Sequence, residues 1–144
     1  MTYKFARIDL DKTNYAITVP WQYLTDPDIP ALNSIYKTYC KHKNFSSVMP
    51  IFDSQYTDPL TDVIGYYDQN ALVAFSLIKR FDSCNAMCYQ FAWTYHNPKM
   101  RLGIETMKVE CAIYKQRGFQ YLYLDQAHLY LSKIDGFETL GPLE

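Results

Sequence analysis

The chain has 144 residues, of which 49% are hydrophobic and 20% are charged, and its formal net charge is −1 at pH 7. This composition is typical of one globular domain, residues 1–144, and excludes an intrinsically disordered chain. Phosphate neutralisation supplies most of the affinity for nucleic acid, so the low charge argues against bulk binding to DNA or RNA. A local contact, for example with tRNA, stays open, because Lys37, Lys41, His42 and Lys43 form one basic cluster.

The N-terminal residues contain no apolar signal-peptide core, and no apolar run reaches the length that spans a membrane. With four cysteines and no leader, the sequence predicts a cytoplasmic protein with free thiols. Cys84 and Cys88 lack a second pair of ligands at zinc-finger spacing. We therefore expect buried thiols and no metal site.

In the first half of the chain, alternating apolar residues over 3–8 and 15–19 predict strands or an extended arm. Pro30 suits the start of a helix over 31–43, whose apolar positions fall on one face. The Pro- and Ser-containing stretch 45–62 is predicted to be a loop with short ordered pieces, and it is the expected region of acceptor contacts.

The second half has clearer periodicity. Three strands, over 63–67, 71–80 and 86–95, are separated by turns and predict an antiparallel meander. A helix is expected over 102–117, with Gly118 as its stop, followed by a strand over 119–124. A short helix over 126–134 and a last strand over 137–140 complete the chain.

The joint between the meander and the long helix contains residues that can bind phosphate. It reads Asn97-Pro-Lys-Met-Arg101-Leu-Gly103-Ile-Glu-Thr106. The first turn of a helix presents unpaired N–H groups and a partial positive charge. Lys99 and Arg101 add cationic charge at this place, and Gly103 allows a close approach to the backbone.

This order of elements and this joint resemble the GNAT superfamily, the GCN5-related N-acetyltransferases. The resemblance implies an α/β (α+β) fold with a mixed, mostly antiparallel sheet and a central crossover helix. It also implies an enzyme that transfers an acyl group from acetyl-CoA, or another acyl-CoA, to a primary amine of a small molecule or protein. The donor-binding residues that it implies are Trp93, Thr94, Tyr95, Lys99, Arg101, Leu102, Gly103, Ile104, Glu105 and Thr106.

The resemblance also implies catalytic candidates. In the family, the acid for the leaving thiolate is often a Tyr on the helix after the fifth strand, shortly before a Gly-Phe pair. Here Ser132 stands at the usual Tyr position, and Tyr130 lies two residues earlier. Asp125 and His128 are candidate bases, because the carboxyl ends of strands open into the crevice of such sheets. A capping role for Asp125 and a core role for Tyr130 stay open as structural alternatives.

Within the superfamily, the C-terminal half is most similar to the arginyl-tRNA–protein transferases. The matching residues are Arg101-Leu-Gly103, Glu110, Tyr121-Leu-Tyr-Leu124, Lys133 and Pro142-Leu-Glu144. This similarity implies aminoacyl-tRNA as an alternative donor. A third alternative is a non-catalytic module, because Glu105 and Ser132 depart from the family pattern. A homodimer through the terminal strand is also open.

Overall fold

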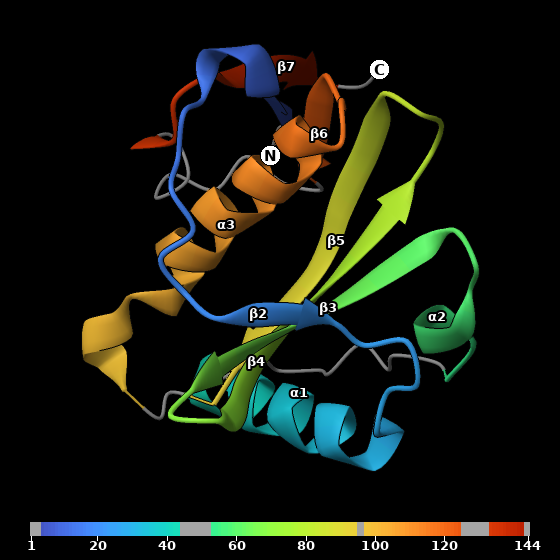
Figure 1. Ribbon diagram of the computed structural model, residues 1–144, viewed down its shortest axis with the longest axis vertical. Helices are drawn as coiled ribbons and strands as arrows, with labels where there is room; N and C mark the ends of the chain where they lie inside the picture. The colour runs from blue at the N-terminus through green and yellow to red at the C-terminus, as the bar shows by residue number, and fades with distance from the viewer. Residues whose placement is uncertain (1–3, 44–52, 95–96, 125–132, 143–144) are drawn as a thin grey trace.

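The computed structural model describes residues 4–43, 53–94, 97–124 and 133–142 (Figure 1). Its elements are β1 (Lys4–Asp9), the 3-10 helix η1 (Leu10–Lys12), β2 (Trp21–Tyr23), α1 (Ile29–Lys43), α2 (Asp53–Thr57), β3 (Thr61–Asp68), β4 (Ala71–Arg80), β5 (Asn85–Trp93), the 3-10 helix η2 (Pro98–Met100), α3 (Leu102–Gln116), β6 (Tyr121–Leu124) and β7 (Phe137–Pro142). No helix among them is both long enough and apolar enough to cross a membrane.

The strands form one seven-stranded sheet with the order β2-β3-β4-β5-β6-β1-β7. The β5–β6 pair is parallel, and the other pairs are antiparallel. A parallel pair needs a crossover connection, and α3 supplies it between β5 and β6. The expected mixed, mostly antiparallel sheet with a crossover helix is confirmed.

Helices cover both faces of the sheet (Figure 1). On one face, buried residues of α3 such as Met107 and Cys111 join one core cluster. On the other face, Leu32 and Ile35 of α1 join a second cluster together with Tyr56 of α2. The apolar faces expected for both long helices are therefore confirmed.

Local sequence explains where several elements begin and end. The Asp28 carboxylate accepts a hydrogen bond from the backbone N–H of Ala31 at the start of α1. Gln69 and Asn70 have φ values of 50° and 69°, which a two-residue hairpin between β3 and β4 requires. Gly118 has a φ of 88° directly after α3, as the helix stop in the sequence predicts.

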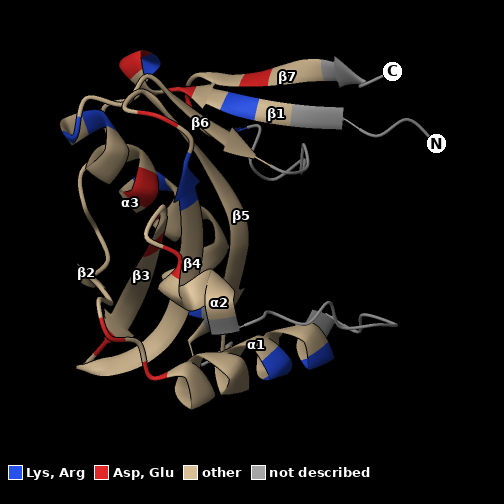
Figure 2. Cartoon of the chain, turned by 90° about the vertical axis from the view of Figure 1, so that its right-hand side faces the viewer, with Lys and Arg blue, Asp and Glu red and all other residues tan. Residues whose placement is uncertain are grey.

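In the N-terminal part, the strand predicted over 3–8 forms as β1, and the second predicted segment does not join the sheet. Strand β1 lies inside the sheet, between β6 and β7, and Arg7 of β1 forms an ion pair with Glu138 of β7 at 2.7 Å (Figure 2). The sequence predicts a strand or an extended arm over 15–19, and the structure has the second alternative: this segment contains no strand and crosses α3 (Figure 1). The Tyr15 hydroxyl there accepts from the backbone N–H of Asp135, and the Lys115 ammonium donates to the Thr13 carbonyl.

Other predictions have mixed outcomes. The loop expected over 45–62 contains α2 and the start of β3, while its first part, 45–52, lies outside the described residues. The helix expected over 126–134 also lies mostly outside them. Cys40, Cys88 and Cys111 are buried free thiols, but the prediction is wrong for Cys84, which is exposed in a turn. The homodimer stays a prediction, although β7 does lie at an edge of the sheet.

Candidate functional site

The parallel ladder between β5 and β6 ends part-way along β5. It pairs Asn85 with Tyr121 and continues to Cys88 and Leu124. Beyond Cys88, β5 continues to Trp93 and pairs with β4 alone among the described residues. Among the described residues, this edge of β5 therefore has no second strand, and a sheet edge of this kind can accept an extended ligand as an added strand.

A β-bulge lies at the same place. Ile78 of β4 pairs with Cys88, and its neighbour Leu77 pairs with Gln90, so Tyr89 is the extra residue of β5. A bulge disrupts the ladder locally and redirects backbone groups, and bulges are frequent near active sites. The end of the β5–β6 ladder and the bulge in β5 thus coincide within one residue.

The N-terminus of α3 follows β5 through the loop and η2. Arg101 precedes the helix with φ 53° and ψ 47°, a left-handed conformation, and its side chain makes no capping hydrogen bond. Its carbonyl accepts from the N–H groups of Ile104 and Glu105. The N–H groups of Leu102 and Gly103 have no backbone partner in the described part of the chain, which is the arrangement that receives an anion.

The predicted donor-binding side chains around this helix start differ in their exposure to solvent. Lys99 and Arg101 are exposed. Leu102 is fully buried, and Thr106 is buried with its hydroxyl donating to the Leu102 carbonyl at 2.6 Å. Ile104 is partly buried against the core. The cationic side chains therefore face solvent here, whereas Leu102 and Thr106 are buried.

Glu105 is held by other parts of the protein. Its Oε2 accepts from the Thr18 hydroxyl at 3.0 Å, and its Oε1 lies 3.7 Å from the Lys108 ammonium. A carboxylate in the first turn also interacts favourably with the helix dipole. Its charge therefore has local compensation, which reduces its repulsion of an anion bound at the helix start.

The remaining predicted residues divide between described and undescribed parts of the chain. Trp93 packs partly against the core beside α3, and the Thr94 N–H donates to the Val73 carbonyl at 3.0 Å. That N–H is therefore already used within the sheet. Tyr95, Asp125, His128, Tyr130 and Ser132 lie outside the described residues.

A buried polar cluster lies under the sheet next to the bulge. Glu110 of α3 is 1% exposed, and its Oε1 lies 3.6 Å from the Cys88 sulfur, which acts as the donor. The Tyr66 hydroxyl and the Ser76 hydroxyl lie 3.1 Å apart in the same cluster. Burial raises the pKa of Glu110 to about 7, although hydrogen bonds from Ser76, Cys88 and Tyr66 oppose the shift. A carboxyl with a pKa near neutrality can accept or donate a proton.

The sequence held a signal for this cluster. Glu110 falls on the helical face that Met107, Cys111 and Tyr114 define, at spacings of three and four residues. An acidic residue on the apolar face of a helix is expected to be buried, and a buried carboxyl group needs hydrogen-bond partners. The pattern therefore predicts a buried, hydrogen-bonded carboxyl group at Glu110. Burial of Glu110 was therefore predictable from the sequence, although Glu110 was noted only among the residues similar to the arginyl-tRNA–protein transferases.

Comparison with solved structures identifies the fold. No protein-family model and no curated protein sequence matches the chain. A GCN5-related N-acetyltransferase from Kribbella flavida superposes with a TM-score of 0.59 at 11% identity, covering 100% of this chain and 59% of that chain. The chain has the GNAT fold.

Two further structures share this fold. The C-terminal domain of a protein from Agrobacterium fabrum described as a lysylphosphatidylglycerol synthetase has a TM-score of 0.66 at 11% identity, covering 87% of this chain and 47% of that chain. Saccharomyces cerevisiae N-myristoyltransferase with bound myristoyl-CoA has a TM-score of 0.57 at 11% identity, covering 99% and 48%. The chain thus spans about half the length of these structures.

Proposed function

We propose that the protein transfers an acyl group from an acyl-CoA, with acetyl-CoA as the first candidate, to a primary amine of a small molecule or protein. One observation carries the proposal. In a GNAT fold, the edge of β5 beyond Cys88, the bulge at Tyr89 and the cationic start of α3 follow one another along the chain. Together they make one strip that suits a long, phosphate-bearing thioester.

The pyrophosphate, the pantetheine arm and the thioester of such a donor would each contact a different part of this strip. The pyrophosphate accepts from the N–H groups of Leu102 and Gly103, and the exposed Lys99 and Arg101 add positive charge beside it. The amide groups of the pantetheine arm pair with the backbone edge of β5 beyond Cys88. The thioester then lies near the bulge, where a redirected N–H can stabilise the oxyanion that forms.

The reaction itself needs little covalent chemistry from the protein. The amine nitrogen attacks the thioester carbonyl, the new C–N bond forms, the C–S bond breaks, and the coenzyme leaves as a thiol after gaining a proton. A base must remove one proton from the attacking amine, and an acid must protonate the thiolate. Asp125 is the proposed base and Tyr130 the proposed acid, with Ser132 in a positioning role.

A second candidate donor is an aminoacyl group carried by tRNA. The likeness to a protein described as a lysylphosphatidylglycerol synthetase favours it, because that name implies an aminoacyl product. The similarity of the C-terminal half to arginyl-tRNA–protein transferases points the same way. The net charge of −1 opposes it, since tRNA binding needs a basic surface.

Product analysis tests these candidates. The protein is incubated with acetyl-CoA and a panel of primary amines, or with aminoacyl-tRNA and the same panel, and products are identified by mass spectrometry. We expect N-acetylated amine and free CoA in equal amounts with acetyl-CoA. N-aminoacylated product with aminoacyl-tRNA alone would establish the second donor. No product with either donor would leave a non-catalytic module and contradict the proposal.

A further inference from the structure

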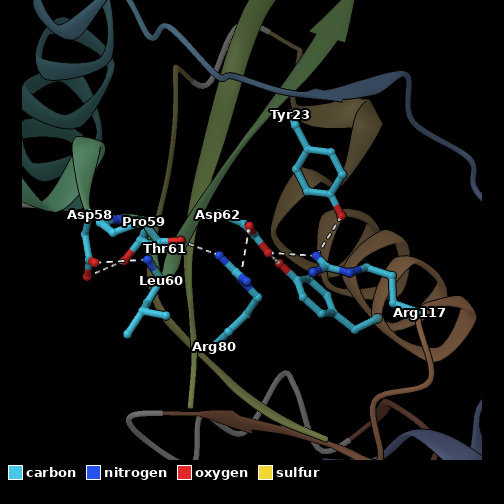
Figure 3. A network of polar contacts seen from close by, with 9 residues as sticks. Tyr23, Asp58, Pro59, Leu60, Thr61, Asp62, Arg80 and Arg117 are labelled. Carbon is cyan, nitrogen blue, oxygen red and sulfur yellow. Dashed lines mark hydrogen bonds and ion pairs between the residues drawn. The ribbon is translucent and has the colours of Figure 1, made fainter. Parts of the chain in front are cut away.

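Two arginines from different elements meet at one carboxylate, at the end of α3 opposite the proposed donor site. Asp62 of β3 accepts from Nη1 of Arg117 at 2.8 Å, and its other oxygen lies 3.3 Å from Nε of Arg80 (Figure 3). The Tyr114 hydroxyl also donates to Asp62. One carboxylate therefore compensates two guanidinium groups, and the trio retains one positive charge.

Arg117 is held in place with only part of its hydrogen-bonding capacity. Its guanidinium carbon lies 5.1 Å from the centre of the Tyr114 ring and 5.2 Å from that of Phe119. Nη1 donates to Asp62 and to the Tyr23 hydroxyl. Its Nη2 and Nε have no hydrogen-bond partner among the described residues, and 35% of the side chain is exposed. A fixed guanidinium with free donors is suited to an incoming oxyanion.

Arg80 is arranged in a similar way. Its Nη2 donates to the Pro59 carbonyl at 2.5 Å, which fixes the guanidinium over the turn before β3. Its Nε is buried and forms no hydrogen bond in the described part of the chain, although it lies near Asp62. A buried atom cannot reach a ligand, so Arg80 contributes a fixed positive charge through the 29% of its side chain that is exposed.

The two arginines stand where two hollows meet. A groove of about 750 Å³ runs between β2, the turn before β3 and the end of α3, and a neighbouring hollow of about 360 Å³ lies beside the β4–β5 turn. Arg80 and Arg117 line both of them. A ligand can therefore place an anionic group at the arginines and extend into either hollow.

Large apolar side chains are exposed around the same arginines. The described ranges contain four exposed large hydrophobic residues. Three of them, Tyr23, Leu60 and Phe81, line the two hollows, and the fourth, Ile17, lines neither. Tyr23 lines the larger groove, and Leu60 and Phe81 line the smaller hollow, with exposed fractions of 51% and 55% for the latter two. Exposed apolar groups gathered around a polar site are typical of a binding surface.

Acidic residues near the arginines have local partners. Asp58, in the larger groove, accepts from the Leu60 N–H and the Thr61 hydroxyl, as Figure 3 shows. Asp82, in the smaller hollow, accepts from the backbone of Cys84 and Asn85. Asp26 also lines the larger groove. These carboxylates disfavour a polyanion, so the ligand is expected to carry a single anionic group, placed at the arginines.

We propose that Arg80 and Arg117 form a second binding site, for an organic molecule that carries one carboxylate or phosphate group joined to an apolar or aromatic group. The oxyanion accepts from the free guanidinium donors, and the apolar part packs against Phe81 and Leu60. The site lies beyond the end of α3, a helix of 15 residues or roughly 22 Å, so it is separate from the proposed donor site at the helix start. It does not depend on the proposed acyl transfer.

Calorimetric titration of the full chain tests the proposal. Phenyl phosphate and benzoate carry both features of the ligand, inorganic phosphate carries only the anion, and phenol carries only the ring. We expect saturable binding of phenyl phosphate or benzoate, weaker binding of inorganic phosphate and none of phenol at the same concentrations. The stronger of the two aromatic anions distinguishes a phosphate site from a carboxylate site. Equal binding of phenol and phenyl phosphate would overturn the proposal.

Variants separate the two parts of the site. Arg117→Gln removes the charge and should weaken phenyl phosphate binding at least about tenfold. Phe81→Ser changes an exposed residue with little effect on folding, and it should weaken phenyl phosphate about fivefold while leaving inorganic phosphate unchanged. Ile17→Ser is the matched control, because Ile17 is 47% exposed, close to the 55% of Phe81, but lines neither hollow. The same effect from Phe81→Ser and Ile17→Ser would contradict the site.

A competition titration tests whether the two sites are separate. Saturating CoA should leave the affinity for phenyl phosphate unchanged. Displacement of phenyl phosphate by CoA would show that the two ligands share one site, and it would overturn a separate second site. Because this readout needs no catalysis, a failure of the proposed acyl transfer would not affect it.

Discussion

Cys88 and Leu124 form the last described pair of the parallel ladder between β5 and β6, and Tyr89 bulges out of β5 at the next position. Cys88 also points under the sheet, where its thiol donates to Glu110 of α3. The end of the β5–β6 ladder, the bulge at Tyr89 and the buried carboxyl group of Glu110 therefore lie next to one another.

Glu110 should make the stability of the protein fall as pH rises. Its pKa is raised from 4.5 to about 7, so between these values the folded state holds a proton that the unfolded state has lost. The resulting stabilisation is full below pH 4.5 and is lost by about pH 7, and it amounts to roughly 3 kcal/mol. Glu110→Gln cannot ionise, so its stability relative to the wild type should increase by about that amount between pH 4.5 and pH 8.

Urea unfolding of both proteins at several pH values measures this difference. Glu110→Gln keeps the size and the hydrogen-bonding capacity of the side chain, so the comparison isolates ionisation. A constant difference between the two proteins across this pH range would show that Glu110 is not protonated in the folded state near neutrality.

Gly136 should tolerate a side chain much less than Gly118. Both have positive φ values, 78° and 88°, so alanine costs about 1–2 kcal/mol at either position. A Cβ at Gly136 would also lie 2.4 Å from the Asp9 carbonyl oxygen, whereas a Cβ at Gly118 would meet nothing within 4 Å. Gly136→Ala should therefore lower the free energy of unfolding by clearly more than Gly118→Ala. Equal losses in urea unfolding would argue against the close contact between β1 and the start of β7.

Much of this fold can be predicted from the sequence, because its second half has strong periodicity and clear turn residues. The β4 range 71–80 and the helix that ends before Gly118 match the structure. The place of β1 between β6 and β7 was not predictable in the same way. Alternation predicts a strand, but not which distant strands pair with it.

The candidate site was predictable only in part. The cationic loop around Arg101 can be recognised because helix starts bind anions through general chemistry. The bulge at Tyr89 depends on the register of β5 against β4, and the arginine site depends on Asp62, Arg80 and Arg117 meeting from three elements. Such relations arise from tertiary packing and leave no local pattern in the sequence.

Ile8 should be an essential core residue although it lies near the N-terminus. It is fully buried in β1, within the core cluster that α3 covers. Ile8→Ala should lower the free energy of unfolding by about 2–4 kcal/mol. Ile17→Ala is the control, because Ile17 is 47% exposed, and it should change stability by less than about 0.5 kcal/mol. Similar small effects of both changes in urea unfolding would place β1 outside the sheet.

The central claim is that the start of α3 binds the phosphate end of an acyl-CoA, and calorimetric titration with acetyl-CoA tests it most directly. The wild type should bind one equivalent saturably. Arg101→Glu should weaken binding at least about tenfold through repulsion of the pyrophosphate. Lys37→Glu, an equal charge reversal at an exposed position of α1, should leave the affinity unchanged. No saturable binding by the wild type, or equal weakening in both variants, would contradict the claim.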